Sequence, residues 1–162
     1  MATAAKFMKL HALLEVTEDL GLSTTVDDSI AQVIEKALEL TAGSTPDVEF
    51  VYHGTVAMSG GAATIDLTAL TNAKGETIAS TGKKVRAIYI VPTSTNANAI
   101  TVKVGASNGY TLFGAAWSVI LAADQYLLAY LGVSAPDVAS GVRTIDLAGT
   151  TTQSVELLIV FG

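Results

Sequence analysis

The sequence predicts a mainly β protein, with an antiparallel β-sandwich at residues 47–162 that follows an N-terminal arm at residues 1–46. Three observations support this fold class. Beyond Pro46, runs rich in Val, Ile, Thr and Tyr are broken by Gly, Asn, Ser and Asp roughly every 8 to 14 residues, which is the spacing of a sandwich or barrel. No long helical pattern separates these runs to carry a parallel crossover. The length of 162 residues fits one domain with an appended arm.

Eight strands are expected in the sandwich. Each is a short apolar or alternating run, and together they cover residues 48–58, 63–67, 85–91, 100–104, 117–121, 126–131, 144–147 and 154–161. The breaks between them have physical causes. Ser59-Gly60-Gly61 and Asn108-Gly109 accept the positive φ of tight turns, and Pro136 cannot continue a ladder of backbone hydrogen bonds. Eight strands are enough for two packed sheets.

The arm has a different pattern. Residues 7–16 fit either a strand or a short extended arm, and the sequence does not decide between them. A helix is predicted at about residues 29–41, because apolar side chains recur there at helical spacing, at Ile30, Val33, Ile34, Ala37 and Leu38. Ser29 and Gln32 resemble a capping box, Asp27 and Asp28 suit a helix N-terminus, and Gly43 supplies a stop. The alternative for residues 37–41 is a strand, since Leu38 and Leu40 also alternate.

The composition indicates a surface that is partly covered by neighbours. Charged residues make up 15% of the chain and apolar residues 50%, against a usual charged share of about 25%. The longest apolar runs, such as residues 157–161, have the length of a strand and fall far short of the ~20 residues of a spanning helix. Glu15 ends the apolar run at residues 10–14 before it reaches the length of a signal-peptide core. We therefore expect no membrane partner and synthesis in the cytoplasm.

The charge and the cysteine count exclude several further classes. The net charge of −6 disfavours nucleic acid as a partner, because binding to phosphates needs an excess of cations. Lys83, Lys84 and Arg86 form one small basic cluster, which we interpret as a solvated strand edge. The absence of cysteine excludes disulfides, thiolate catalysis and cysteine-ligated zinc.

The sequence predicts no enzyme, no cofactor and no metal site. The two histidines, His11 and His53, have no partner at a metal-ligand spacing. Glu18-Asp19 and Asp27-Asp28 lie in polar segments, where paired acids are usually solvated. No Gly-x-Ser-x-Gly elbow is present, and the glycines at residues 105–109 lack the strand-to-helix context and the lysine of a phosphate loop.

Self-association is the prediction that remains. A sandwich with few charges and with strands such as residues 155–161 presents apolar area or open edges that invite association. The large aromatic residues are assigned to the core or to a subunit interface, with a sugar-binding platform beside Asn108 as the alternative. The candidate interface residues are Phe7, Leu10, Leu13, Leu14, Tyr110, Trp117 and Tyr126.

Residues 64–162 resemble a family of tailed-bacteriophage virion proteins, the jelly-roll capsid decoration or cement proteins and related minor structural proteins. The order and character of several segments carry the resemblance. These are Ile65-Asp66-Leu67-Thr68, residues 82–90, the loop Thr95-Asn96-Ala97-Asn98, Ile100-Thr101-Val102, residues 105–109, Ala135-Pro136-Asp137 and the ending Val160-Phe161-Gly162.

The resemblance implies a jelly-roll domain, often a homotrimer, on the capsid surface of a virion, where it strengthens contacts between subunits of the major capsid protein. In that family a terminal arm commonly reaches a neighbour, and no catalytic or ligand residues exist to carry over. The helical pattern at residues 29–41 departs from a simple β arm. Two alternatives stay open: a receptor- or carbohydrate-binding tail module that uses loops around Asn96 and Tyr110, and an internal neck or tail component.

Overall fold

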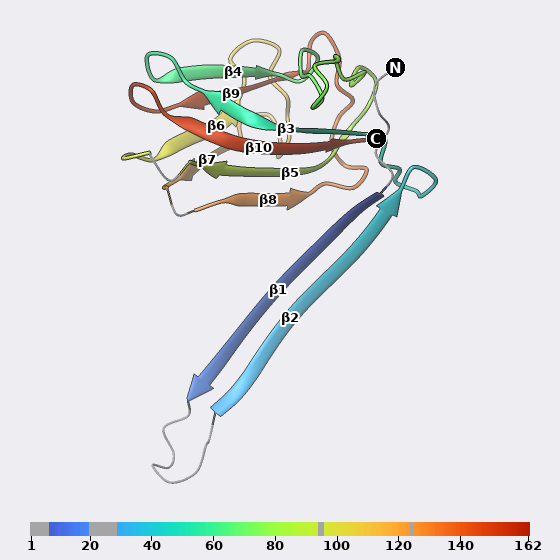
Figure 1. Ribbon diagram of the computed structural model, residues 1–162, viewed down its shortest axis with the longest axis vertical. Helices are drawn as coiled ribbons and strands as arrows, with labels where there is room; N and C mark the ends of the chain where they lie inside the picture. The colour runs from blue at the N-terminus through green and yellow to red at the C-terminus, as the bar shows by residue number, and fades with distance from the viewer. Residues whose placement is uncertain (1–6, 20–28, 94–95, 124) are drawn as a thin grey trace.

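The structure is a computed structural model, which describes residues 7–19, 29–93, 96–123 and 125–162. These residues form ten strands and no helix. Figure 1 shows two parts, a body of two packed sheets and a two-stranded ribbon that projects from one end of it. The predicted antiparallel β-sandwich is confirmed. Part of the predicted arm, at residues 1–6 and 20–28, lies outside the described residues, as does Thr95 of the loop Thr95-Asn96-Ala97-Asn98.

The body contains the eight expected strands in two sheets of four. One sheet, called sheet I here, has the order β3 (Phe50–Ala57), β10 (Ser154–Phe161), β5 (Val85–Pro92) and β8 (Leu127–Tyr130). The other, sheet II, has the order β4 (Ala62–Asp66), β9 (Thr144–Ala148), β6 (Ile100–Val104) and β7 (Ser118–Leu121).

The strands of the body pair in a nested order. β3 pairs with β10, β4 with β9, β5 with β8 and β6 with β7, and every pair is antiparallel. The chain therefore follows the path of one long hairpin that is folded over so that its successive segments fall alternately in sheet I and sheet II. Within the body, only the connection between β6 and β7 joins neighbours of one sheet.

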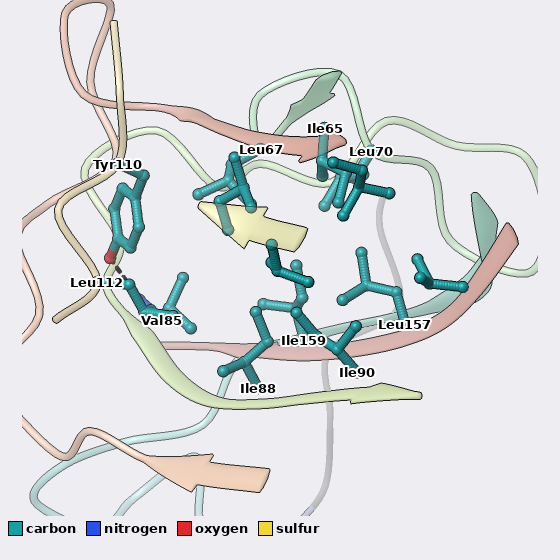
Figure 2. Packing of buried hydrophobic residues seen from close by; sticks show 14 of the residues in the cluster. Ile65, Leu67, Leu70, Val85, Ile88, Ile90, Tyr110, Leu112, Leu157 and Ile159 are labelled. Carbon is teal, nitrogen blue, oxygen red and sulfur yellow. Dashed lines mark hydrogen bonds between the residues drawn. The ribbon is translucent and has the colours of Figure 1, made fainter. Parts of the chain in front are cut away.

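The core lies between the two sheets. Alternate residues of β10 point inward, so that Val155, Leu157 and Ile159 are buried while Glu156 is exposed. Figure 2 shows Leu157 and Ile159 beside Ile88 and Ile90 of β5, opposite Leu67 and Ile65. This layer of aliphatic side chains fixes the register of sheet I, because a slip of one residue would turn every core side chain to solvent.

The arm is a long antiparallel hairpin. β1 (Phe7–Asp19) pairs with β2 (Ser29–Thr41), from Phe7 opposite Thr41 to Asp19 opposite Ser29. At about 3.3 Å per residue each strand is roughly 40 Å long. The segment at residues 7–16, which the sequence left undecided, is thus a strand. The capping residues Asp27 and Asp28 lie outside the described residues.

The helix predicted at residues 29–41 is wrong, and β2 occupies its place. β2 pairs with β1 along its whole length, and this pairing hydrogen-bonds the backbone groups on one edge of the extended strand. The β-branched side chains of Val33 and Ile34 also favour an extended chain. Apolar residues placed at both the helical and the alternating positions made the spacing ambiguous, and the alternative of a strand at residues 37–41 was the correct one.

Candidate interface on the arm and sheet I

The outer face of sheet II carries a polar row, beside a second row formed by Ala62, Ala148, Thr101 and the exposed Ile120. One row crosses its four strands in register, through Thr64, Asp146, Lys103 and Ser118. The hydroxyl of Thr64 donates to Oδ1 of Asp146 at 2.7 Å, and the backbone amide of Ala106 donates to Oδ2 of the same carboxylate at 2.8 Å. This face is suited to contact with water.

The outer face of sheet I is mostly apolar. Its strands place two full rows side by side: Val51, Val160, Ala87 and Tyr130, then His53, Leu158, Tyr89 and Leu128. A third row holds Thr55, Glu156 and Val91, and the ring of Tyr126 lies 5.7 Å from that of Tyr89. We call the apolar members of these rows the outer patch: Val51, Ala87, Tyr89, Val91, Tyr126, Leu128, Tyr130, Leu158 and Val160.

Much of the outer patch is open to solvent. Tyr126 is 63% exposed, Val51 41%, and Leu128 and Tyr130 38% each. The main polar group among them is an exposed pair, in which Nε2 of His53 lies 2.7 Å from Oε1 of Glu156. A contiguous apolar area of this kind, with so few polar groups, is typical of a surface that another molecule covers.

The arm has one apolar face, and its base packs on the outer patch. In the hairpin register Met8 lies opposite Leu40, Leu10 opposite Leu38, and Leu14 opposite Ile34, with Val16 further along the same face. We call these seven residues the arm strip. At the base of the arm, three of them join a small buried cluster with residues of the body, and the cluster comprises Met8, Leu38, Leu40, Val48, Ala87, Leu158 and Val160.

The far half of the arm strip is exposed. Ile34 is 73% exposed, Leu14 59% and Val16 50%. Between this half and β8 the surface is hollowed over about 300 Å³, with Leu14, Ile34 and Lys36 on one side and Tyr126 and Leu128 on the other. A two-stranded hairpin with an open apolar face is marginally stable in water on its own, so the arm is built to be covered.

The opposite face of the arm carries charged pairs. Nζ of Lys9 lies 3.3 Å from Oε2 of Glu39, and Nε2 of His11 lies 2.8 Å from Oε1 of Glu35. All four side chains are more than half exposed, so each pair contributes little to stability. The same face also exposes Phe7, Leu13 and Val33, so it is mixed in character, whereas the arm strip is continuous.

Five of the predicted interface residues lie on the surface or at its margin. Phe7, Leu13, Leu14 and Tyr126 are exposed, and Leu10 is half-buried. Leu10 and Leu14 belong to the arm strip and Tyr126 to the outer patch. Phe7 and Leu13 alternate with the strip and lie on the charged face of the hairpin.

Tyr110 and Trp117 are core residues in the structure, so their assignment to the interface is corrected. Tyr110 is fully buried, and its hydroxyl accepts from the amide of Val85 at 3.1 Å and donates to the carbonyl of Pro136 at 2.7 Å. Burial raises the pKa of Tyr110 to about 12. Trp117 Nε1 donates to the carbonyl of Tyr110 at 2.9 Å, and its ring meets Phe113 edge-on at 5.5 Å. Both rings find polar partners inside the body, which is how large aromatic residues are satisfied in a core.

Most of the outer patch and the part of the arm strip on β2 were not predicted from the sequence. A usable signal was present. β5 (VRAIYIVP) and β10 (SVELLIVF) are apolar on both faces, and such strands indicate that both faces of the sheet are covered. Ile34 was hidden by its interpretation as part of a helix.

Other surface groups offer little chemistry. Among the residues that the structure describes, no cluster of three or more His, Asp or Glu side chains could hold a metal ion. Asn96, expected in a recognition loop, is buried: its Nδ2 donates to the carbonyl of Ser154 at 2.7 Å and its Oδ1 accepts from the amide of Ser154 at 3.1 Å. Within the described ranges no helix is long and apolar enough to cross a membrane.

Comparison of the chain with models of protein families, with curated proteins and with solved structures found no match.

Proposed function

We propose that this chain is a structural protein of a tailed-phage virion, which decorates the outside of the capsid, binds the major capsid protein and stabilises the shell without catalysing a reaction. The observation that carries the proposal is the arm. A roughly 40 Å hairpin with an apolar strip, continuous with an apolar sheet face, is a device for joining molecules.

The strand order supports the same proposal. Nested pairing of eight strands across two sheets is the topology of a jelly roll, a fold used by many capsid proteins. It agrees with the resemblance of residues 64–162 to jelly-roll decoration proteins. The polar outer face of sheet II then faces water, while the arm and sheet I make the contacts of a homo-oligomer, a trimer in this proposal, and of its shell.

Binding to capsids tests the function. Purified protein is incubated with undecorated phage heads, which are then sedimented and heated. We expect the protein to sediment with the heads and to raise the temperature at which they rupture. Ile34→Asp places a charge on the arm strip and should reduce binding, whereas Ile120→Asp, at the outer edge of sheet II and 67% exposed, should not. Heads that neither bind the wild-type protein nor gain stability would exclude the proposal.

The alternative of a carbohydrate-binding tail module has weaker support, because Tyr110 and Asn96, on which it was based, are buried. The exposed rings of Tyr126 and Tyr130 are the groups that a sugar would still find. A glycan-array signal that is lost in Tyr126→Ala would favour this alternative. An internal neck or tail position is distinguished from the capsid surface by imaging labelled particles.

A further inference from the structure

We infer that the arm of one copy of this chain lies across the outer patch of a second copy, with its arm strip facing the sheet. The inference deepens the proposed function by naming the partner surface. It concerns contacts between copies only, so it can be tested without a capsid. In a ring, each copy gives one arm and receives one.

The first argument is that the arm cannot cover its own sheet. Among the described residues, its apolar side chains pack on the body at the base, through Met8, Leu38 and Leu40, and the arm then diverges from sheet I (Figure 1), leaving a hollow beside β8. Leu14 and Ile34, in the far half of the arm strip, therefore stay exposed. Tyr126 and Leu128, on the other side of the hollow, are exposed as well. The far half of the arm strip and the exposed part of the outer patch are both apolar, so each can bury the other.

The second argument is the size of the contact. Exposed side chains of this size, at the fractions given above, supply on the order of 600 Å² of apolar surface for one arm-to-sheet contact, counted over both partners. A reciprocal dimer places two such contacts in one interface and reaches about 1,200 Å², the lower end of the range for stable interfaces, whereas each interface of a three-membered ring holds one contact. Two arms packed only on each other would leave the outer patch uncovered.

The third argument is charge. Among the side chains that the structure describes, Lys36 is the one cation on the apolar side of the arm, and Glu156 is the one acid on the outer face of sheet I. Each is the main charge interrupting its apolar surface. An arm laid on a neighbour's sheet brings opposite charges to the same contact, whereas an arm packed on another arm brings two lysines to it.

Cysteine cross-linking tests the contact directly, because the chain has no cysteine of its own. Ile34→Cys and Leu128→Cys variants, one of them isotopically heavy, are produced together and oxidised. A disulfide needs Cα atoms within about 7 Å, so a mixed dimer reports an arm on a neighbour's sheet. The matched control pairs Ile34→Cys with Ile120→Cys on sheet II. It should give no more mixed disulfide than random collisions in solution produce. Ile34→Cys dimers alone, or no product, would overturn the inference.

Solution mass provides the second readout. We expect the wild-type chain to be an oligomer, and Ile34→Asp to weaken self-association at least about tenfold while Ile120→Asp has no effect. Lys36→Glu and Glu156→Lys should each weaken it, and the double variant should restore it. A wild-type chain that stays monomeric at every concentration would overturn the inference. If the protein is an oligomer but does not bind capsids, the proposed capsid function is excluded and the contact between copies is not. If it is a monomer that binds capsids, the contact between copies is excluded and the capsid function is not.

Discussion

The body and the arm are both made of antiparallel ribbons with apolar faces, yet they satisfy those faces in opposite ways. In the body, the folded hairpin brings two sheets together, so Leu157 and Ile88 find partners within the chain. In the arm, Leu14 and Ile34 face solvent. The body can therefore be stable alone, whereas the far half of the arm strip contributes stability only when another molecule covers it. Substitutions in the two regions should separate folding from assembly.

The largest effect is expected from truncation in the core. Leu157→Ala should lower the free energy of unfolding by about 3 kcal/mol, because it removes fully buried methyl groups and leaves a cavity. Leu14→Ala should change it by less than about 0.5 kcal/mol when measured on dilute monomer, because the side chain is already exposed. Urea unfolding measures both. Equal losses would mean that the arm is covered within its own chain.

A smaller loss is expected when the buried hydroxyl of Tyr110 is removed. Tyr110→Phe leaves the amide of Val85 and the carbonyl of Pro136 without a partner, which should cost about 1–3 kcal/mol. Figure 2 shows this hydroxyl beside Val85 in the core. Phe113→Ala removes a partly exposed ring that contacts Trp117. It serves as a control for the effect of disturbed packing near Tyr110 without loss of a buried hydrogen bond. Thermal unfolding at pH 7 compares them.

The stability of the protein at alkaline pH should also depend on the buried hydroxyl of Tyr110. Burial raises the pKa of Tyr110 to about 12, so the folded state favours the neutral phenol. Its contribution to stability is complete below about pH 10, the ordinary value, and is lost as the pH rises from there through about 12. The stability of Tyr110→Phe should fall less steeply over this range. If the free energy of unfolding falls equally steeply with pH in the wild-type protein and in Tyr110→Phe, the raised pKa of the buried phenol is contradicted.

The joint between arm and body should show an acid-sensitive effect. Nη2 of Arg86 donates to Oδ1 of Asp47 at 2.6 Å and Nη1 donates to the carbonyl of Gly132 at 2.9 Å. The hydrogen bond from Arg86 lowers the pKa of Asp47, so this pair contributes stability above the ordinary pKa of the carboxyl and loses it as the pH falls through the lowered value. Arg86→Ala should cost about 2 kcal/mol at pH 7 and flatten the acid branch of the stability curve.

The smallest effect is expected on the polar face of sheet II. Thr64→Val removes an exposed hydrogen bond to Asp146 and should change the free energy of unfolding by less than about 0.5 kcal/mol. Self-association should not change either. A loss of oligomer in Thr64→Val would show that both outer faces take part in assembly, and the contrast between the two sheets would fail.

The strands of the body could be predicted because their local signals agree with their burial. Turn glycines, a proline and alternating apolar residues mark each boundary, and all eight strands were found. The arm could not be predicted as fully, since residues 29–41 satisfy both helical and extended spacing. Only the pairing with β1, whose residues lie ten or more positions away along the chain, decides between them.

The interface was only partly predictable for a related reason. Aromatic size suggested Tyr110 and Trp117, but whether such a ring lies inside or outside depends on the far segments that enclose it, here Val85 and Pro136. Leu14 and Tyr126 were found because they stand out locally. The two-sided apolar pattern of β5 and β10 is the local signal of the outer patch, but its extent depends on the alignment of four strands drawn from distant parts of the chain.

The position of β10 also sets the order in which the protein can be made. This strand follows the other nine in the chain, yet it lies between β3 and β5 in the middle of sheet I. During translation, sheet I therefore has a gap until Ser154–Phe161 leave the ribosome. The outer patch is incomplete before that moment, so in the proposed assembly a chain still being translated cannot yet receive a neighbour's arm on its sheet.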